Sequence, residues 1–434
     1  MPKSQNHRSM RPRNVFLVRD REPIQPMGEP ACQALLLGGT IGSAMQVRLS
    51  EFGLAISYVE TLEDAFDRAR REPLGALVTF DSLACSTSVL RSLLDAPGSA
   101  RAALPDALGT RALSHIGGLE PVSIDDHPAF AAPLWIVRPD ATTDLPLLLL
   151  PYKEMEWKLP APPAMLGQTN VSFGATGTYA IRVGHWAHIL WLNQADLIAR
   201  WFDNRRTFSA KMWLLWRLLL GFPWRRGRLA AAFRHIHRRA KVHYSAHVEF
   251  SFVEEGANIG AQAVVKNSWV GRGAQIQEGA IVNGSVVGEG AFVAATSSIL
   301  GCVLYPGALA AQHKMQLSVL GRNAAAFTGS YFYDVNFERN VRVLHRGKLV
   351  DSGTRTLSVC LGPSARVAGG IWIASGREVP AHAMVIQPPD HIVHRIDPAL
   401  ASAHMTTVKA GALVEVGGTA KDGPATPPDP SGPR

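Results

Sequence analysis

The chain has 434 residues, of which 47% are hydrophobic, and a formal net charge of +9. That length is enough for two or three domains, and the hydrophobic content is ordinary for a soluble globular protein. The sequence contains no run of about 20 apolar residues, and no apolar run of signal-peptide length follows its basic N-terminus. We therefore expect a cytoplasmic protein rather than a membrane-spanning or exported one, and the positive charge suggests an anionic partner.

The four cysteines, Cys32, Cys85, Cys302 and Cys360, show no spacing typical of a metal or redox pair. A reducing cytoplasm is the simplest setting for such a chain.

Residues 1–30 are polar and rich in Arg and Pro, and we expect them to form a disordered tail. From residue 34 the pattern alternates between short apolar runs and amphipathic stretches, which predicts a parallel or mixed sheet covered by helices. Thr61 is placed to cap the helix predicted over 61–71. The expected strands are 34–37, 54–59 and 76–80. The expected helices are a stretch that follows the turn at 38–42 and runs to Phe52, then 61–71 and 87–94.

Residues 185–241 are aromatic and basic, and they predict a helical connector. Within it, residues 211–220 are strongly apolar, and arginines follow at Arg225, Arg226 and Arg228. One interpretation is a cap that covers the open end of a repeat domain, and this is the one we favour. The other is an interfacial helix, with 211–241 lying on an anionic membrane surface at the inner face of the membrane. No nucleic-acid-binding motif accompanies the charge, so nucleic acid is not an expected partner.

From Val242 the sequence repeats with a period of 17 residues. The blocks AHVEFSFVEEGANIGAQ, AVVKNSWVGRGAQIQEG and AIVNGSVVGEGAFVAAT follow one another from Ala246, and SSILGCVLYPGALAAQH continues them. Aliphatic residues recur at intervals of five or six, and a small residue usually sits four positions later. Three short strands per turn would place the aliphatic side chains on the axis of a triangular prism, with each coil buried only by its neighbours. The pattern predicts a parallel β-helix.

The repeat is interrupted at 327–358, where Arg346-Gly347 predicts the turn of a hairpin, and it resumes with aliphatic residues six apart from Leu361 to Val385. The last residues are rich in Pro and Gly and should be disordered. The predicted organisation is a tail (1–30), an α/β domain (31–184), the connector (185–241), a β-helix (242–326), an excursion (327–358), a β-helix continuation (359–390) and a tail (391–434).

Two motifs in the repeats carry a family resemblance. The entry Val242-His243-Tyr244-Ser245-Ala246 and the coil that starts at Ile373 resemble the left-handed β-helices of bacterial hexapeptide-repeat transferases. That resemblance implies a left-handed prism and a homo-oligomer, most simply a trimer. Trp269 and Phe292 point outward in this scheme, and large exposed apolar side chains are typical of interfaces.

The order of the two domains resembles sugar-1-phosphate nucleotidyltransferases, in which an α/β domain precedes a β-helix. The resemblance implies a phosphate-binding loop at Gly38-Gly39-Thr40-Ile41-Gly42 and a Mg²⁺-binding Asp81, and it suggests Lys158 as a ligand for the substrate. Gly177-Thr178-Tyr179-Ala180 is similar to a strand near the family's sugar pocket. The arginine expected directly after the loop glycines is absent, and Arg48 comes several residues late, so the domain is predicted to be degenerate. A plain turn at 38–42 and a helix cap at Asp81 are the structural alternatives.

Hexapeptide acyltransferases use a histidine that projects from a coil as general base, and His247 and His313 are the candidates here. A solvated histidine is the alternative for each. The sequence thus leaves three hypotheses. The first is a transferase-like protein that acts on or binds a sugar phosphate or sugar nucleotide for cell-envelope or polysaccharide synthesis. The second is an acyltransferase that uses acyl-CoA or an acyl carrier protein, and the third is a non-catalytic scaffold or regulator.

Overall fold

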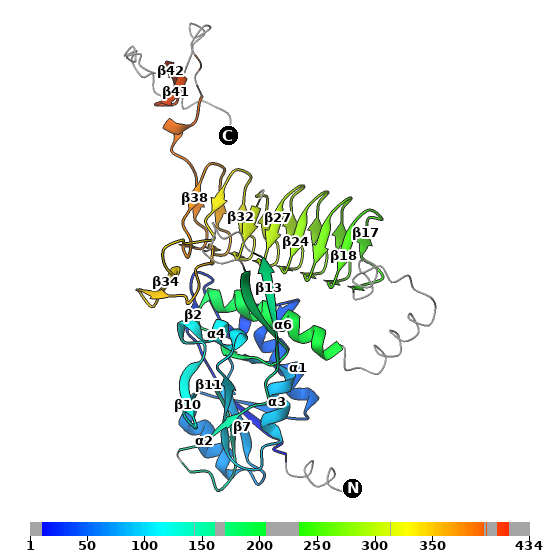
Figure 1. Ribbon diagram of the computed structural model, residues 1–434, viewed down its shortest axis with the longest axis vertical. Coiled ribbons are helices and arrows are strands. Elements are labelled where there is room, and N and C mark those ends of the chain that lie inside the picture. The colour runs from blue at the N-terminus through cyan, green and yellow to red at the C-terminus, as the bar shows by residue number, and fades with distance from the viewer. Residues whose placement is uncertain are drawn as a thin grey trace.

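The computed structural model describes residues 11–142, 144–160, 170–204, 234–312, 314–394, 396 and 406–415. These residues form an α/β domain and a long parallel β-helix that lies across one end of it (Figure 1). No helix within the described ranges is long and apolar enough to cross a membrane.

A seven-stranded mixed sheet forms the centre of the α/β domain, in the order β12-β9-β11-β7-β1-β6, with β10 paired to β11. β1 pairs in parallel with both β6 and β7, whereas β11 runs antiparallel to β7 and β9. The predicted α/β class is therefore confirmed. The strands are β1 (Asn14–Val18), β6 (Ala55–Val59), β7 (Ala76–Phe80), β9 (Ala100–Pro105), β10 (Glu120–Ile124), β11 (His127–Val137) and β12 (Leu147–Leu149).

The expectation of a disordered tail over residues 1–30 is wrong for its second half. β1 lies between β6 and β7, and Val15, Phe16, Leu17 and Val18 are all buried. The short pairs β2 (Pro23–Ile24) and β3 (Glu29–Pro30) follow. A four-residue apolar run with arginines nearby on both sides is easily mistaken for part of a polar tail, because flanking charge hides the pattern of a strand that is buried on both faces.

Two helices cover opposite faces of the sheet. α1 (Ile41–Glu51) shares a core with Val15 and Leu17, whereas α2 (Leu62–Arg71) packs with Phe16 and Val18. Thr61 caps α2 as predicted. The chain passes from β1 to β6 on one side and then to β7 on the other, so the strand order reverses at β1. In open α/β sheets, ligands bind outside the carboxyl ends of the strands at such a switch point.

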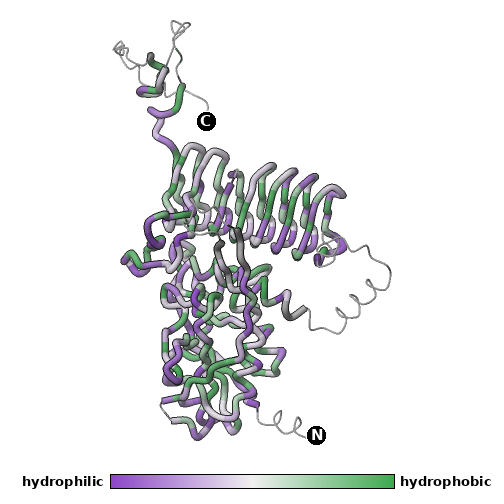
Figure 2. Tube along the Cα trace, viewed as in Figure 1, coloured by the Kyte–Doolittle hydropathy of each residue, from purple (hydrophilic) through white to green (hydrophobic). Residues whose placement is uncertain are grey.

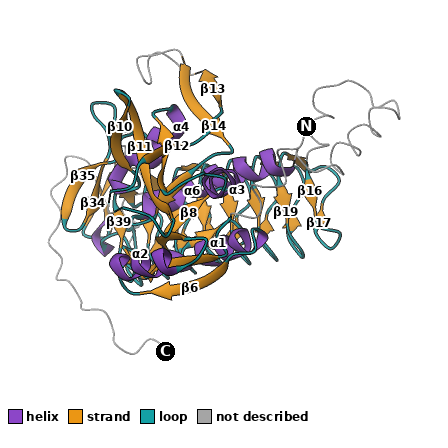
Figure 3. Ribbon diagram, turned by 90° about the horizontal axis from the view of Figure 1, so that it is seen from below, coloured by secondary structure: helices purple, strands orange, loops and turns teal. Residues whose placement is uncertain are grey.

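One long helix of this domain connects it to the β-helix (Figure 3). The 19-residue helix α6 (Trp186–Asn204) runs between the sheet and the prism. The remaining elements of the domain are η2 (Ala31–Gln33), β4 (Leu35–Leu36), β5 (Gly39–Thr40), β8 (Leu83–Cys85), α3 (Thr87–Leu94), α4 (Leu108–Ser114), η3 (His115–Gly117), β13 (Glu154–Pro160), β14 (Asn170–Thr176) and β15 (Ala180–Arg182).

Three parallel sheets form the prism and confirm the predicted β-helix. The first face holds β16 (His235–Ile236), β19 (Phe252–Val253), β22 (Trp269–Val270), β25 (Val286–Val287), β28 (Val303–Leu304), β31 (Val319–Leu320), β36 (Cys360–Leu361) and β39 (Glu378–Val379). The second holds β17 (Lys241–Val242), β20 (Asn258–Ile259), β23 (Gln275–Ile276), β26 (Phe292–Val293), β29 (Leu309–Ala310), β32 (Ala325–Ala326), β37 (Arg366–Val367) and β40 (Met384–Val385). The third holds β18 (His247–Glu249), β21 (Val264–Lys266), β24 (Ile281–Asn283), β27 (Ser298–Leu300) and β30 (Lys314–Gln316), and β33 (Tyr331–Phe332) with β38 (Trp372–Ile373) follows them.

The prism begins at His235, earlier than the predicted Val242. Residues 234–241 were expected to continue a basic helix, but β16 and β17 already pair with the next coil. Ile236 and Val242 pack against the axial core six residues apart, which is the hexad spacing. The arginines at 238 and 239 lie at the corner between these strands, where charge is compatible with a turn. Residues 205–233, on which the cap and membrane-surface interpretations depend, lie outside the described ranges.

The interior of the prism follows the repeat. The axial residue of each coil, such as Val253, Val270 and Val287, is fully buried, and hydrophobic stretches recur from coil to coil (Figure 2). A second column adds hydrogen bonds: the backbone N–H of Ser268 donates to Ser251 Oγ over 3.2 Å, and that of Ser285 donates to Ser268 Oγ over 3.1 Å. Cys302 continues this column, buried as expected. Aliphatic packing therefore stabilises the prism, and a serine ladder adds to it in the coils from Ser251 to Cys302.

The excursion is shorter than predicted at its start. β33 still pairs in parallel with β38, so residues 327–332 remain in the prism. The chain then leaves as β34 (Arg342–His345) and β35 (Lys348–Asp351), an antiparallel hairpin whose turn is at Arg346-Gly347, as predicted. Both turn residues have positive φ, which suits the twist of a two-residue hairpin. After the prism comes η4 (Pro389–His391), at the end of the predicted β-helix continuation. A hairpin of β41 (Thr406–Lys409) and β42 (Ala412–Glu415) then forms within the tail that was expected to be disordered.

The first face of the prism packs on the α/β domain. Phe252, Trp269, Val286 and Val303 belong to the same hydrophobic core as α1 and α6. Trp269, expected to contribute to an interface between subunits, points out of the prism but is only 7% exposed because its own chain covers it. The trimer remains a prediction, and one of the three prism faces is already occupied.

Candidate functional site

Acidic and basic side chains meet at the carboxyl ends of β1 and β7. Asp20 follows β1 and Asp81 follows β7, and the backbone N–H of Asp20 donates to Asp81 Oδ1 over 2.8 Å. The Asp20 carboxylate accepts hydrogen bonds from Ser82 Oγ and Arg182 Nη2, each 2.8 Å long. The Arg182 guanidinium also lies over the Phe80 ring, 4.2 Å from its centre. The switch point of the sheet is therefore lined by a carboxylate–guanidinium pair and a second carboxyl.

The two carboxyls have different electrostatic environments. Burial by itself would raise the pKa of Asp20, but hydrogen bonds from Arg182 and Ser82 outweigh it and lower that pKa below its usual value. Burial raises the pKa of Asp81, and the charge of Asp20 adds to that rise. Asp20 is therefore an anion held by Arg182, and Asp81 is the group at this edge that can take up a proton more readily.

The predicted Mg²⁺ at Asp81 does not fit this donor set. No group of three or more His, Cys, Asp or Glu side chains within the described part of the chain could hold a metal ion. The neighbouring carboxylate, Asp20, is already neutralised by Arg182, so one carboxyl remains where a hard cation needs several oxygen ligands.

The glycine-rich segment is the corner of a small hairpin rather than a loop after a sheet strand. β4 and β5 pair around Leu37-Gly38. The buried amide of Asn193 holds this hairpin, since it accepts from the Leu37 N–H over 2.7 Å and donates to the Leu35 carbonyl over 2.9 Å. A Cβ added at Gly38 would lie 2.9 Å from the Trp269 ring. Close packing against the prism thus explains why position 38 is a glycine.

The other residues of that segment have local contacts. Thr40 caps α1 in a reciprocal capping box with Ser43. A Cβ at Gly39 would lie 2.9 Å from Ser43 Oγ, and one at Gly42 would lie 3.0 Å from the Cys32 carbonyl oxygen. These contacts favour the structural interpretation of the glycines, and their role in binding phosphate remains a prediction.

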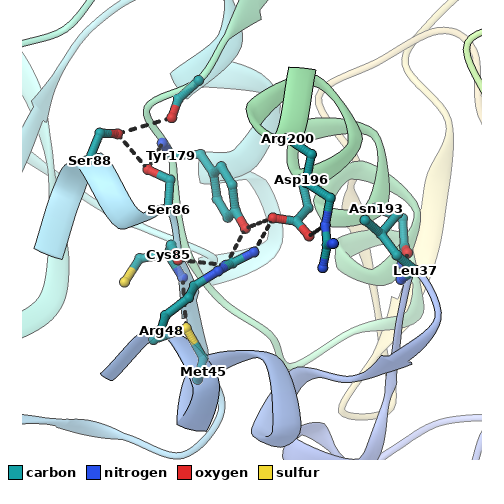
Figure 4. A network of polar contacts seen from close by, with 11 residues as sticks. Leu37, Met45, Arg48, Cys85, Ser86, Ser88, Tyr179, Asn193, Asp196 and Arg200 are labelled. Atoms are coloured by element: carbon teal, nitrogen blue, oxygen red, sulfur yellow. Dashed lines mark hydrogen bonds and ion pairs between the residues drawn. The ribbon is translucent and has the colours of Figure 1, made fainter. Parts of the chain in front are cut away.

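Arg48, the late arginine of the predicted phosphate loop, lies in a buried network (Figure 4). Its Nη1 donates to the Cys85 carbonyl over 2.7 Å and to Tyr179 Oη over 2.8 Å, and its Nη2 pairs with Asp196. Tyr179 donates to Asp196 over 2.7 Å, and burial raises the pKa of its hydroxyl. Arg48 and Tyr179, which directly precedes β15, therefore link α1, α6 and the start of β15, and Arg48 is not available to a phosphate.

Two of the predicted site residues are described only in part or not at all. Lys158 lies in β13, opposite Ser172 of β14, but its side chain is outside the described set. His313 also lies outside the described residues.

His247 is paired with a carboxylate on the first coil of the prism. Its Nε2 lies 2.7 Å from Glu249 Oε1, and Lys266 Nζ lies 3.3 Å from Glu249 Oε2. Val248 points to the axis, so His247 and Glu249 both point outward from β18. Burial would raise the pKa of Glu249, but hydrogen bonds from His247 and Lys266 outweigh it and lower that pKa. Glu249 is therefore an anion that can orient the imidazole.

Sequence reasoning named His247 and missed both partners. The signal was present: Glu249 is two residues away and so shares a strand face, and Lys266 lies 17 residues after Glu249, directly opposite it in the next coil. Asp20 and Arg182 carried no such signal, because they come together only through the fold.

No family model matches the chain, and no curated protein matches its sequence. Among solved structures, it is similar to a mutant of GDP-perosamine N-acetyltransferase from Caulobacter crescentus in complex with CoA and GDP-perosamine. The two are 18% identical over 35% of this chain and 51% of that chain, with a TM-score of 0.12. The match spans about half of that chain. A likeness of this size carries no argument about activity, and the β-helix assignment rests on the strand pairing.

Proposed function

We propose that the protein is a transferase of the hexapeptide-repeat type that moves an acyl group from a thioester to a sugar, with His247 as general base. The observation that carries this proposal is the 2.7 Å contact between His247 and Glu249 on an outward face of the prism. A histidine oriented by an ionised carboxylate is an arrangement that supports general-base catalysis.

In this reaction, the Nε2–H of a neutral His247 donates a hydrogen bond to the Glu249 carboxylate, which leaves Nδ1 as the basic nitrogen. Nδ1 takes a proton from an amino or hydroxyl group of the sugar as that group attacks the thioester carbonyl. The new C–N or C–O bond forms, the C–S bond breaks, and the departing thiolate receives the proton from the imidazolium. Glu249 stabilises the imidazolium, and the acyl donor is acyl-CoA or an acyl carrier protein.

His247→Gln should lower kcat by about 10²–10⁴-fold, which is the usual contribution of a general base. The measurement is thiol release from acetyl-CoA in the presence of a panel of amino-sugar nucleotides. His243→Gln is the matched control, because His243 lies on the same coil and, among the described residues, its ring nitrogen bonds Ser245 rather than a carboxylate. Glu249→Gln should lower kcat with little change in KM, since Glu249 positions the base. If His247→Gln and His243→Gln retained equal turnover, the assignment of the base would be wrong.

A second candidate function is binding of a sugar nucleotide at the carboxyl edge of the sheet. It is favoured by Arg182, whose guanidinium is held by Asp20, stacks on Phe80 and is still 39% exposed. A planar guanidinium recognises phosphate in a bidentate manner.

Arg182→Met should weaken binding of a nucleoside diphosphate sugar at least tenfold in calorimetry, because it removes the charged contact to phosphate. Arg101→Met is the matched control, since Arg101 also lies over an aromatic ring but pairs with Glu120 on another part of the sheet. Equal affinity of the Arg182→Met and wild-type proteins would exclude this edge as the phosphate site.

A further inference from the structure

The excursion from the prism clasps the α/β domain. We call residues 334–357 the strap. At its turn, Arg346 forms an ion pair with Glu22, two residues beyond Asp20. The Leu344 carbonyl lies 3.1 Å from His185 Nε2 at the start of α6, and Gly353 lies so close to the His115 ring that an added Cβ would overlap it. The strap therefore touches three separate parts of the α/β domain (Figures 1 and 3).

Four histidines gather under and beside the strap. The ring of His345, on the strap, lies 5.7 Å from that of His185, which lies 6.2 Å from that of His188. His188 accepts the Gly184 N–H at Nδ1 and faces the His115 carbonyl oxygen over 2.9 Å at Nε2. His185 accepts the Ala187 N–H at Nδ1 and faces Leu344 at Nε2. In its neutral tautomer, each of these two rings accepts a backbone N–H at Nδ1 and donates to a backbone carbonyl from Nε2. A second proton on either ring would therefore displace the backbone donor at Nδ1.

Charge in this junction is opposed by burial and by the neighbouring rings. Burial lowers the pKa of His188 to about 3 and also lowers the pKa of His115. Burial, followed by His185 and Arg346, lowers the pKa of His345. Asp351 favours protonation of His115, and Glu22 and Glu378 favour protonation of His345. Glu378 also lies 3.5 Å from His185 Nε2 and accepts the Trp186 indole N–H. These carboxylates make protonation of His115 and His345 less unfavourable, but they do not outweigh the effect of burial.

We propose that the strap is an acid-released clasp: it is bound to the α/β domain at neutral pH, and protonation of the histidine cluster detaches its hairpin. Docking stabilises the neutral rings, so it is complete above the ordinary histidine pKa of about 6.5 and is lost as the pH falls below it. Each histidine whose pKa is lowered in the docked state and restored on detachment shifts the equilibrium toward the open state as the pH falls. Opening separates Arg346 from Glu22 and so uncovers the chain next to Asp20.

The experiment is hydrogen exchange of the full chain at pH 7.5, 6.5 and 5.5, corrected for the intrinsic dependence of exchange on pH. Amides of β34 and β35 should exchange at least tenfold faster at pH 5.5, whereas those of β25 and β28, in the middle of the prism, should not change. Uniform exchange of the β34–β35 hairpin across this range would overturn the proposal.

Two substitutions at one position keep the proposal falsifiable. His345→Gln removes a titrating group and should shift release to lower pH. His345→Arg places a permanent charge against His185 and should give fast exchange of the hairpin already at pH 7.5. His382→Gln, at an exposed corner of the prism away from the strap, is the control and should behave as wild type. Indistinguishable exchange in the glutamine and arginine variants would show that charge at this junction does not govern docking.

Discussion

Val270→Asp is expected to abolish folding. Val270 lies on the prism axis in β22, is fully buried, and is surrounded by the aliphatic residues of the coils before and after it. A carboxyl there has no hydrogen-bond partner, and even its protonated form costs about 2–7 kcal/mol to bury. The loss of the valine packing adds to this cost. Because a whole domain is stable by about 5–15 kcal/mol, we expect little folded protein.

The matched control is Ile281→Asp, on β24 of the same coil, whose side chain points outward and is 44% exposed. That variant should unfold within about 0.5 kcal/mol of wild type, as surface substitutions usually do. Thermal and denaturant unfolding, followed by circular dichroism, separate the two. A Val270→Asp protein that melted with the wild type would remove the assignment of the axis.

Arg48→Met is expected to destabilise the protein by about 3–5 kcal/mol, because it leaves Asp196 charged and buried without its partner. The Asp196 side chain is 1% exposed, and its other cation, Arg200, lies 3.5 Å away and is 43% exposed. The Tyr179 hydroxyl loses a donor in the same step. Unfolding in urea measures the loss.

Arg68→Met on α2 is the control, since Arg68 forms an exposed ion pair with Asp64 that should contribute about 0.3–0.5 kcal/mol. Adding Asp196→Leu to Arg48→Met should recover part of the stability, because replacing both members of a buried pair costs less than removing one. Equal stability of Arg48→Met and Arg68→Met would mean that the buried pair is not linked to folding.

The prism could be predicted from the sequence because its contacts are periodic. Over most of the prism, each strand pairs with a strand 16 or 17 residues further along the chain. Columns of similar residues therefore appear in the sequence itself. The start of the prism was misplaced because the strands around Ile236 and Val242 lie among arginines, which give no aliphatic repeat. The predicted start of the excursion was too early for a related reason. Phe332 occupies the axial position of its coil, but its aromatic neighbours hide the aliphatic repeat.

The candidate site was predictable only where the repeat determines its neighbours. His247, Glu249 and Lys266 lie within one period, and the repeat fixes their proximity. The pair of Asp20 and Arg182 joins residues at opposite ends of the α/β domain, and no local pattern reports such a contact. The same limit applies to Trp269: the repeat shows that it points outward, but not that Gly38 and α6 cover it.

The strap also affects the order in which the prism can fold. From β16 to β31, each new strand of the first face closes a loop of one coil, so folding can advance by short, local steps. The next pairing joins Val319 to Cys360, which is more than twice that span. Each doubling of loop length costs only about 0.6 kcal/mol of closure entropy, but the longer loop interrupts the coil-by-coil growth of the prism. We therefore expect the coils after the strap to form a separate late unit of folding, which assembles only when the hairpin has docked and brought Cys360 back to the growing end.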